Sequence, residues 1–501
     1  MSVHPAAPGH QLATGVKDKN EVQQIDRAES RGQDEIIKPS YLNVDEFGAH
    51  DKVDPKEIAL VRKIDIFCLP VLWLMYFFNF LDRNAIANGK LNGLAEDLNL
   101  KGTQFNTCVS ILFVGYLCGQ IPSNMILSRV RPSIYMSGKE TYEGFMVTWS
   151  IVTLLSYKAY NFETLLVCRF LLGIVEAPFY PGAVYIMSML YTRKEIASRM
   201  SIFYTGNICA SAFSGLIAAG VFSMDGKMGL AGWRWLFIIQ GALSLAVALP
   251  SFYLLPDSPL QTRWLSQEQR ELAYNRIRID TTNLTEEPTS VWSGLKQAAS
   301  DWRTWVFCLM ANLHFMTNGF KNFLPTVVNT FGLSTTATMG LTCPPYILSG
   351  AVTVLVSWSS GRQNERTWHI IGCKLAAIVG FTLSVATLNI PARYCGIMIF
   401  VGATYGVNNL IVSWASNVLG ESNEKRAVAI AMTNTFGNLA SVYSPYLWPD
   451  ADAPRFMKAM VSSIAFCLAV IVCALGLKWW LKRLNKKMRV ENPNTENYFV
   501  Y

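Results

Sequence analysis

The stretch Arg169-Phe170-Leu171-Leu172-Gly173-Ile174-Val175-Glu176-Ala177-Pro178 places two ionisable side chains inside an otherwise apolar run. Arg169 and Glu176 are seven residues apart. This is two turns of an α-helix, so both side chains share one face, about 10 Å apart along the axis. An ionisable residue at membrane depth costs at least about 2.5 kcal/mol and is retained where it lines a cavity or meets a partner. The stretch therefore predicts a membrane helix that faces a polar pathway containing a proton site.

The composition indicates a membrane protein. Of the 501 residues, 51% are hydrophobic and only 16% are charged, and the mean hydropathy is +0.24. Apolar runs long enough to cross a bilayer recur along the chain. We expect twelve spans, at about residues 64–81, 105–127, 142–157, 163–190, 200–223, 233–255, 303–330, 340–358, 368–389, 393–418, 427–447 and 457–481.

Basic residues gather in the loops that follow the even-numbered spans. Arg193, Lys194 and Arg199 follow span four, and Lys425 and Arg426 follow span ten. The alternate loops contain few basic residues, so the positive-inside rule predicts that the even-numbered loops and both termini are cytoplasmic. Because this pattern explains the net charge of +8, we expect the lipid bilayer, and no nucleic acid, as a partner.

The chain divides into two halves of six spans each. We expect a disordered cytosolic N-terminal tail at residues 1–60, an N-terminal six-helix bundle at 61–256 and a cytosolic central loop at 257–301. A C-terminal six-helix bundle at 302–482 and a cytosolic tail at 483–501 complete the organisation. In the central loop, Ser266-Gln267-Glu268-Gln269 is a capping box that predicts the start of a short basic helix.

The predicted fold class is an all-α polytopic membrane protein with 12 transmembrane helices in two pseudo-symmetric six-helix bundles. The halves also share a loop pattern, since Ser128-Arg129-Val130-Arg131 after span two has a counterpart in Ser360-Gly361-Arg362 after span eight. Two corresponding halves are typical of the major facilitator fold, in which substrate binds at the midplane between them.

Several motifs carry a more specific resemblance. They are Asn79-Phe80-Leu81-Asp82-Arg83-Asn84, Gln120-Ile121-Pro122-Ser123-Asn124, the residues 169–182, Gly232-Trp233-Arg234-Trp235-Leu236-Phe237, Phe323-Leu324-Pro325 and Phe436-Gly437-Asn438. Over about residues 55–480 the sequence resembles the anion:cation symporter branch of the major facilitator superfamily, in its fungal allantoate-permease-like form. Members of that branch import organic anions such as vitamins, ureides and other carboxylates, generally with protons.

The resemblance implies a permease that is driven by the proton gradient and needs no other cofactor. We expect a monomer in the plasma membrane, with a small organic anion as substrate. One departure from the family pattern is the charged stretch Lys139–Glu143, which overlaps the expected start of span three. Because charges are costly in lipid, this stretch predicts either a polar turn that shortens span three or an insertion.

Glu176 is the candidate for proton coupling, because a carboxylate in a low-dielectric cavity can take a proton on one side and lose it on the other. The alternative is a fixed structural pair with Arg169. For Arg169 itself, a tuning or structural role is preferred over direct contact with substrate.

Arg83 is the candidate for substrate binding, because its planar guanidinium fits a carboxylate and stays charged throughout the cycle. The alternative is a juxtamembrane arginine at the outer end of span one. Asp82 is either a second proton site or the counter-ion of Arg83. Asn79 lies one turn before Arg83 and is expected to hydrogen-bond the same substrate group.

The second half supplies neutral polar candidates. Asn318 and Asn322 are one helical turn apart in span seven, with His314 a further turn before them. Asn409 in span ten and Tyr180 in span four are further candidates for the substrate pocket. The alternative for the amides is helix packing, because intramembrane amides also hold helices together.

Enzymatic and metal signals are absent from the sequence. The eleven cysteines form no CxxC pair, so we expect no metal site and no disulfide framework. The sequence also contains no nucleotide-binding loop and no credible catalytic triad. We therefore expect a protein that is not an enzyme.

Two classes of function remain. The first is a proton-coupled secondary transporter for a small organic anion, with import favoured and proton-driven efflux as a variant. The second is a nutrient sensor of the same fold that does not transport. The acidic and basic residues in spans one and four favour transport, because a receptor needs no protonatable coupling site.

The topology gives the first prediction. Reporter tags at about residue 20 and about residue 495 are both expected to be protected from an external protease in sealed cells. The reason is that the positive-inside rule places both termini in the cytoplasm. A tag that is cleaved from outside at either end would contradict this topology.

Overall fold

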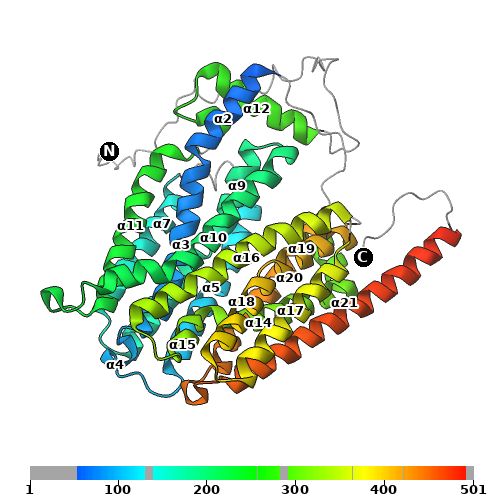
Figure 1. The fold of residues 1–501 in the computed structure, drawn as a ribbon. Helices are drawn as coiled ribbons and strands as arrows, with labels where there is room; N and C mark the ends of the chain where they lie inside the picture. Colours follow the sequence, from blue (N-terminus) through cyan, green and yellow to red (C-terminus); the bar gives the residue numbers. More distant parts are fainter. Residues whose placement is uncertain are drawn as a thin grey trace, which may run out of the picture. The chain divides into compact units, whose positions relative to one another are not determined.

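The computed structural model describes residues 54–129, 139–256, 258–282, 291–363, 365–420 and 423–491. Within these ranges the chain is helical and contains no strand. The longer helices are α2 (Pro55–Phe67), α3 (Leu69–Lys90), α5 (Gln104–Arg129), α7 (Lys139–Leu155), α8 (Phe162–Glu176), α9 (Phe179–Leu190), α10 (Arg193–Phe222), α11 (Gly232–Leu254), α12 (Gln267–Thr282), α13 (Val291–Ser300), α14 (Trp302–Thr317), α16 (Thr335–Gln363), α17 (Thr367–Ala386), α18 (Ile390–Thr404), α19 (Val407–Val418), α20 (Asn423–Tyr443) and α21 (Met457–Glu491) (Figure 1).

Short helices complete the described chain. They are α4 (Leu94–Asp97), α15 (Leu324–Asn329) and the 3-10 turns η1 (Ser156–Lys158), η2 (Lys227–Gly229), η3 (Pro259–Gln261), η4 (Asn318–Asn322), η5 (Ser444–Leu447) and η6 (Asp450–Asp452).

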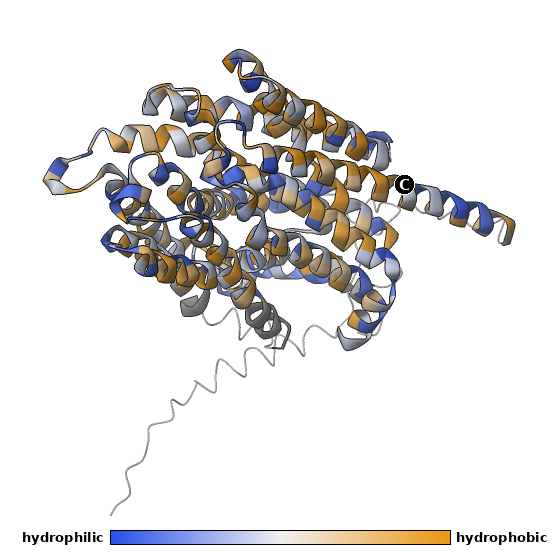
Figure 2. Ribbon diagram, turned by 90° about the horizontal axis from the view of Figure 1, so that it is seen from below, coloured by the Kyte–Doolittle hydropathy of each residue, from blue (hydrophilic) through white to orange (hydrophobic). Residues whose placement is uncertain are grey.

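A helix, or a consecutive group of helices, lies at each of the twelve expected spans. Among the described residues, seven helical stretches are long and apolar enough to cross a membrane by length and composition alone. Several other spans are interrupted: Pro178 separates α8 from α9, and η4 separates α14 from α15. Hydrophobic residues cover much of the helix length, whereas hydrophilic residues gather at the C-terminal end of α21 (Figure 2).

The helix packing repeats at an interval of six spans. In the first half α3 packs on α10 and α11, α5 packs on α8, and α7 packs on α11. The corresponding contacts in the second half are α14 on α20 and α21, α16 on α18, and α17 on α21. Between the halves, α10 packs on α16 and α5 packs on α20. Because α10 corresponds to α20 and α16 corresponds to α5, these two contacts are equivalent under the symmetry that relates the halves. The contacts therefore define two pseudo-symmetric six-helix bundles, and the expected fold class is confirmed.

Both ends of the helical region extend beyond the expected boundaries. The helix α2 begins at Pro55, inside the segment 1–60 that was expected to be disordered, and it buries Leu60, Val61 and Ile64. This spacing gives α2 one apolar face, which packs in the core of the first half. The last helix likewise continues to Glu491, past the expected boundary at residue 482. Residues 1–53 and 492–501 lie outside the described residues.

The central loop contains the helix that its capping box predicts. The backbone N–H of Gln269 donates to Ser266 Oγ at 3.3 Å, and the backbone N–H of Ser266 donates to Gln269 Oε1 at 3.2 Å. These reciprocal bonds confirm the capping box at the start of α12. On the same helix, Arg276 lies 2.7 Å from Glu195 and 3.6 Å from Glu57, so α12 is attached to α10 and α2.

Glycines bring α5 and α8 into backbone contact. A Cβ atom at Gly173 would lie 2.0 Å from the carbonyl oxygen of Leu112, and one at Gly115 would lie 2.3 Å from that of Phe170. Only glycine permits this approach, because a side chain at either position would overlap the backbone of the other helix. The close packing fixes the position of α8, and with it Arg169 and Glu176, relative to the first three spans.

The second prediction concerns this contact. Gly173→Ala is expected to force α5 and α8 apart and to lower stability by about 1–3 kcal/mol, the usual cost of overpacking. Gly372→Ala in α17 is the matched control, because a Cβ atom there meets no atom within 4 Å. The thermal midpoint in detergent should fall for Gly173→Ala and stay constant or rise for Gly372→Ala. Equal midpoints would show that the helix contact tolerates a side chain.

Candidate functional site: a charged cavity between the two bundles

An ion pair joins span one to span four. The Arg83 Nε atom on α3 donates to Glu176 Oε2 on α8 at 2.6 Å. The glutamate side chain is fully buried, and that of the arginine is 16% exposed. Within the part of the chain that the structure describes, the second carboxylate oxygen, Oε1, has no hydrogen-bond partner. The pair therefore connects a buried acid to a base that reaches the solvent-accessible space.

Arg83 lies within its helix and not at its end. The helix α3 continues to Lys90, seven residues beyond Arg83 and about 10 Å further along the axis. The guanidinium also lies over the Tyr116 ring, 4.7 Å from its centroid. The helix of span one therefore extends well past the expected end at residue 81, and Arg83 lies inside it.

Arg169 is buried without a carboxylate partner. Its side chain is on α8, the residue is 1% exposed, and none of its three guanidinium nitrogens has a hydrogen-bond partner among the described residues. Its charge lies over the ring of Phe237 on α11, 5.3 Å from the centroid. The fixed pair between Arg169 and Glu176 is thus not formed, since Glu176 pairs with Arg83.

Asp82 faces span six. Its residue is fully buried, and Oδ2 accepts a hydrogen bond from Ser244 Oγ on α11 at 2.9 Å, whereas Oδ1 has no partner. Arg83 therefore takes Glu176, and not Asp82, as its counter-ion. Asn79 is 2% exposed and lies beside Glu176, with its amide nitrogen unpartnered.

Span six contributes polar residues that the sequence analysis did not select. Phe237, Gln240 and Ser244 are at positions i, i+3 and i+7 of α11, so they share one face. Gln240 is fully buried, and neither of its amide atoms has a hydrogen-bond partner. The signal in the sequence was a glutamine within an apolar span, the same type of signal that drew attention to Glu176.

A cavity lies between the bundles beside these charges. The space there is narrow in this structure, about 10 Å³, which has room for about one water molecule. The lining residues come from spans one, two, four and seven: Arg83, Ile86, Cys108, Val109, Leu112, Phe113, Arg169 and Asn322. Two guanidinium groups and one amide are the polar lining groups, and the described lining contains no carboxylate. Such a lining suits a small anion.

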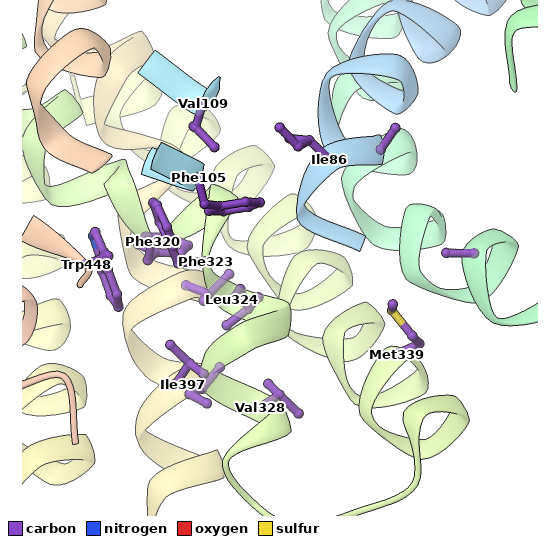
Figure 3. Close-up of a cluster of buried hydrophobic side chains, with 14 of the residues drawn as sticks. Ile86, Phe105, Val109, Phe320, Phe323, Leu324, Val328, Met339, Ile397 and Trp448 are labelled. Atoms are coloured by element: carbon purple, nitrogen blue, oxygen red, sulfur yellow. The ribbon is translucent and has the colours of Figure 1, made fainter. Parts of the chain in front are cut away.

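A hydrophobic cluster closes the space beyond this cavity. Figure 3 shows Ile86 and Val109 of the cavity lining in the same cluster as Phe105, Phe323 and Trp448. The rings of Phe323 and Trp448 stack with their centroids 5.7 Å apart. The cluster draws on both halves of the chain, so it seals one end of the interface between the bundles.

Polar contacts between the halves lie at the same end as this cluster. Lys90, the last residue of α3, pairs with Asp450 of η6 at 2.6 Å. Near the start of α5, the Asn106 amide donates to the carbonyl oxygens of Pro445 and Trp448 at 2.5 and 3.2 Å. The end at which α3 ends and α5 begins is therefore closed in this structure.

The two asparagine candidates of span seven lie in different environments. Asn322 lines the cavity, but Asn318 is buried and contacts His314. The expectation that the two amides share one face is wrong, because α14 ends at Thr317 and residues 318–322 form a 3-10 turn. In a 3-10 helix, residues three apart eclipse each other, and residues four apart do not.

Two other candidates lie away from the cavity lining. Asn409 is exposed on α19. The hydroxyl of Tyr180 is hydrogen-bonded to that of Tyr204, within an aromatic group that includes Tyr76 and Phe203. Neither residue contributes to the cavity in this structure.

The sequence analysis also missed a buried lysine. Lys374 on α17 is fully buried and contacts His314. A single lysine within an apolar span was the available signal, and it resembles that of Arg169.

The chain belongs to the major facilitator superfamily. The sequence profile of the Major Facilitator Superfamily matches residues 72–445. The chain is 32% identical over 444 residues to the MFS-type transporter cnsO of Penicillium expansum, covering 86% of this chain and 84% of that protein. It is 31% identical to the major facilitator-type transporter hxnP of Emericella nidulans, covering 86% and 87%. These findings identify a multi-pass membrane transporter.

More distant similarities agree with this fold. The pantothenate transporter liz1 of Schizosaccharomyces pombe is 26% identical, covering 86% of this chain and 85% of that protein. An inward-facing bacterial homolog of the human lysosomal transporter Spinster has a TM-score of 0.62 at 17% identity, covering 85% and 96%. A D-xylose–proton symporter has a TM-score of 0.59 at 13% identity, covering 81% and 97%.

The third prediction follows from the ion pair. Arg83→Ala leaves the Glu176 carboxylate buried without its partner and is expected to lower stability by about 3–5 kcal/mol. The double variant Arg83→Ala/Glu176→Gln removes both charges and is expected to recover most of this loss. Thermal unfolding in detergent measures both effects. A double variant no more stable than Arg83→Ala would contradict an interaction between these two side chains.

Proposed function

We propose that this protein is a proton-coupled importer of a small organic anion. The observation that carries the proposal is the Arg83–Glu176 ion pair at the edge of a cavity whose described lining contains cations and an amide but no carboxylate. A substrate carboxylate and the Glu176 carboxylate are then alternative partners for one guanidinium.

This competition couples the proton to the substrate. When Glu176 is ionised, it occupies the Arg83 guanidinium, which is then not available to a substrate carboxylate. When Glu176 takes a proton, its attraction for the guanidinium weakens and Arg83 is free to bind a carboxylate in a two-pronged geometry. Release of the substrate lets the proton leave and the pair form again. Asp82, with one unpartnered oxygen one residue before Arg83, is the proposed second proton site.

Arg169 is proposed to provide a second positive contact for the substrate. A buried charge without a partner is costly, and the cost is removed when an anion occupies the cavity that Arg169 lines. This revises the expectation of a purely tuning role. Asn322 of the opposite half faces the same cavity, so an anion there contacts both bundles. Asn79 is proposed to hold the Glu176 carboxylate or the substrate through its free amide nitrogen.

The topology and the relatives support import of a carboxylate. By the basic-loop pattern, the closed end with Lys90 and Asp450 faces outward and both termini are cytoplasmic. We propose a monomer in the plasma membrane with an inward-releasing conformation. A relative named as a pantothenate transporter supports a carboxylate substrate and placement in the anion:cation symporter branch.

The fourth prediction tests coupling by exchange. Uptake of a panel of labelled carboxylates, pantothenate and allantoate among them, is measured in a host without its own carriers, at about pH 5 and about pH 7.5. The wild-type protein is expected to accumulate one of them more strongly at the lower external pH. Glu176→Gln should lose accumulation and retain counterflow exchange, because exchange moves no net proton.

Three outcomes of this experiment would contradict the proposal. Full pH-driven accumulation by Glu176→Gln would remove Glu176 as the coupling residue. Binding of a carboxylate without transport by the wild type would indicate a sensor, and outward movement against the gradient would indicate efflux. Glu163→Gln, at an exposed position in the first turn of α8, is the matched control and should transport as the wild type does.

A further inference from the structure

A chain of three buried polar groups lies within the second bundle. The Nζ atom of Lys374 on α17 is 3.0 Å from Nδ1 of His314 on α14. The other ring nitrogen, Nε2, is 2.9 Å from the amide nitrogen of Asn318 at the start of η4. Lys374 and His314 are fully buried, and Asn318 is 6% exposed. The three groups thus form one continuous hydrogen-bonded chain away from water.

Two arrangements of protons satisfy these contacts, one for each orientation of the Asn318 amide. In the first, the amide nitrogen faces the ring and donates to Nε2 of His314. A neutral imidazole with an accepting Nε2 carries its hydrogen on Nδ1, which then donates to Nζ of Lys374. A nitrogen that accepts a hydrogen bond has a free lone pair. The lysine in this arrangement is therefore a neutral amine.

Adding one proton reverses both bonds. A Lys374 ammonium donates to Nδ1, which moves the ring hydrogen to Nε2. The Nε2–H group then requires an acceptor, and the amide oxygen of Asn318 becomes one after a half-turn of the amide group. That oxygen has no hydrogen-bond partner among the described residues, so no bond to them is broken to release it. The two forms differ by a single proton and keep the three residues in contact.

The surroundings provide no fixed counter-ion. By sequence, residues 302–481 contain five acidic residues, Glu365, Glu421, Glu424, Asp450 and Asp452, all of which lie outside the α14 and α17 helices. The titratable side chains that face the chain are Lys321 from η4, Cys373 from α17 and Cys467 from α21. In the other neighbouring helices, Arg393 of α18 bonds Thr330 and Pro454, Lys425 of α20 bonds Asp301, and α19 contains no titratable residue.

We propose that Lys374, His314 and Asn318 form a proton-binding site in the C-terminal bundle that binds and releases one proton by reversing its two hydrogen bonds. Without a carboxylate to hold an ammonium permanently, the neutral and protonated forms are both accessible. The site is separate from Asp82 and Glu176, which belong to the other bundle.

The position of Asn318 connects this site to the cavity. Asn318 and Asn322 begin and end the same five-residue turn η4, and Asn322 lines the cavity with Arg83 and Arg169. A half-turn of the Asn318 amide therefore takes place where the α14 helix ends and the η4 turn begins, within span seven. A contribution of this site to transport rests on the proposed proton coupling, but proton binding by the three residues does not.

The test measures the histidine tautomer in the full-length protein, with no substrate and no gradient. The protein is labelled with ¹⁵N-histidine and reconstituted in lipid nanodiscs; it contains five histidines, and His314→Gln identifies the signal of His314. Spectra are recorded from about pH 5 to about pH 10, so that the protonated and the neutral form of the site are both sampled. We expect the hydrogen to be on Nδ1 at the alkaline end and on Nε2 at the acidic end.

Two variants separate a proton site from a structural contact. Lys374→Met keeps the length of the side chain and is expected to abolish the tautomer reversal. His369→Gln, which replaces a histidine near Glu365, is the matched control and should preserve it. Glu176→Gln should also preserve it, because that carboxylate belongs to the other bundle.

One tautomer throughout the pH range in the wild type would overturn the proposal, and so would an unchanged reversal in Lys374→Met. If Glu176→Gln fails in transport while the reversal persists, the proton site of the second bundle stands independently of the proposed coupling residue. If the reversal is absent while carboxylate transport is normal, the proposed function stands without this site.

Discussion

The buried Arg83–Glu176 ion pair is the interaction on which the first bundle is organised. A pair of charges in a low-dielectric interior is tolerated only when its geometry is good. Here that geometry depends on the positions of the helices α3, α5 and α8. The helix α3 must continue past Arg83, and α8 must lie close to α5, which the glycine contacts at Gly115 and Gly173 allow. With Arg83 and Glu176 engaged, Arg169 remains buried at the cavity lining without a hydrogen-bond partner among the described residues.

The two bundles have the same packing but treat buried charge differently. In the first bundle, acids and bases occur together, so the ionised groups nearly balance. In the membrane helices of the second bundle, Lys374 and Lys321 occur with His314 and without a described carboxylate. Pseudo-symmetry therefore applies to the backbone and not to the chemistry. At the cavity, the Arg83 and Arg169 cations of one half meet the Asn322 amide of the other half.

The closed end of the interface explains how the cavity is isolated from one side of the membrane. Aromatic packing among Phe105, Phe323 and Trp448 excludes water, while the Lys90–Asp450 pair and the Asn106 hydrogen bonds fix the bundles relative to each other. The salt bridge is partly exposed, so its contribution is small and easily reversed. A contact that closes firmly but opens at low cost is what alternating access requires.

Much of the fold was predictable from local sequence. The length of the apolar runs, the basic loops and the capping box at Ser266 are all read from residues that are close together in sequence. Polar residues in apolar runs mark membrane sites because their burial is costly. Partner choice was not predictable. Each partner comes from a helix that is distant in sequence. Glu176 pairs with Arg83 instead of Arg169, Asp82 bonds Ser244, and Lys374 contacts His314. Likewise, the break at Thr317 turned Asn318 away from Asn322. A sequence specifies which groups must be satisfied, whereas only packing of the helices determines which groups are close enough to satisfy them.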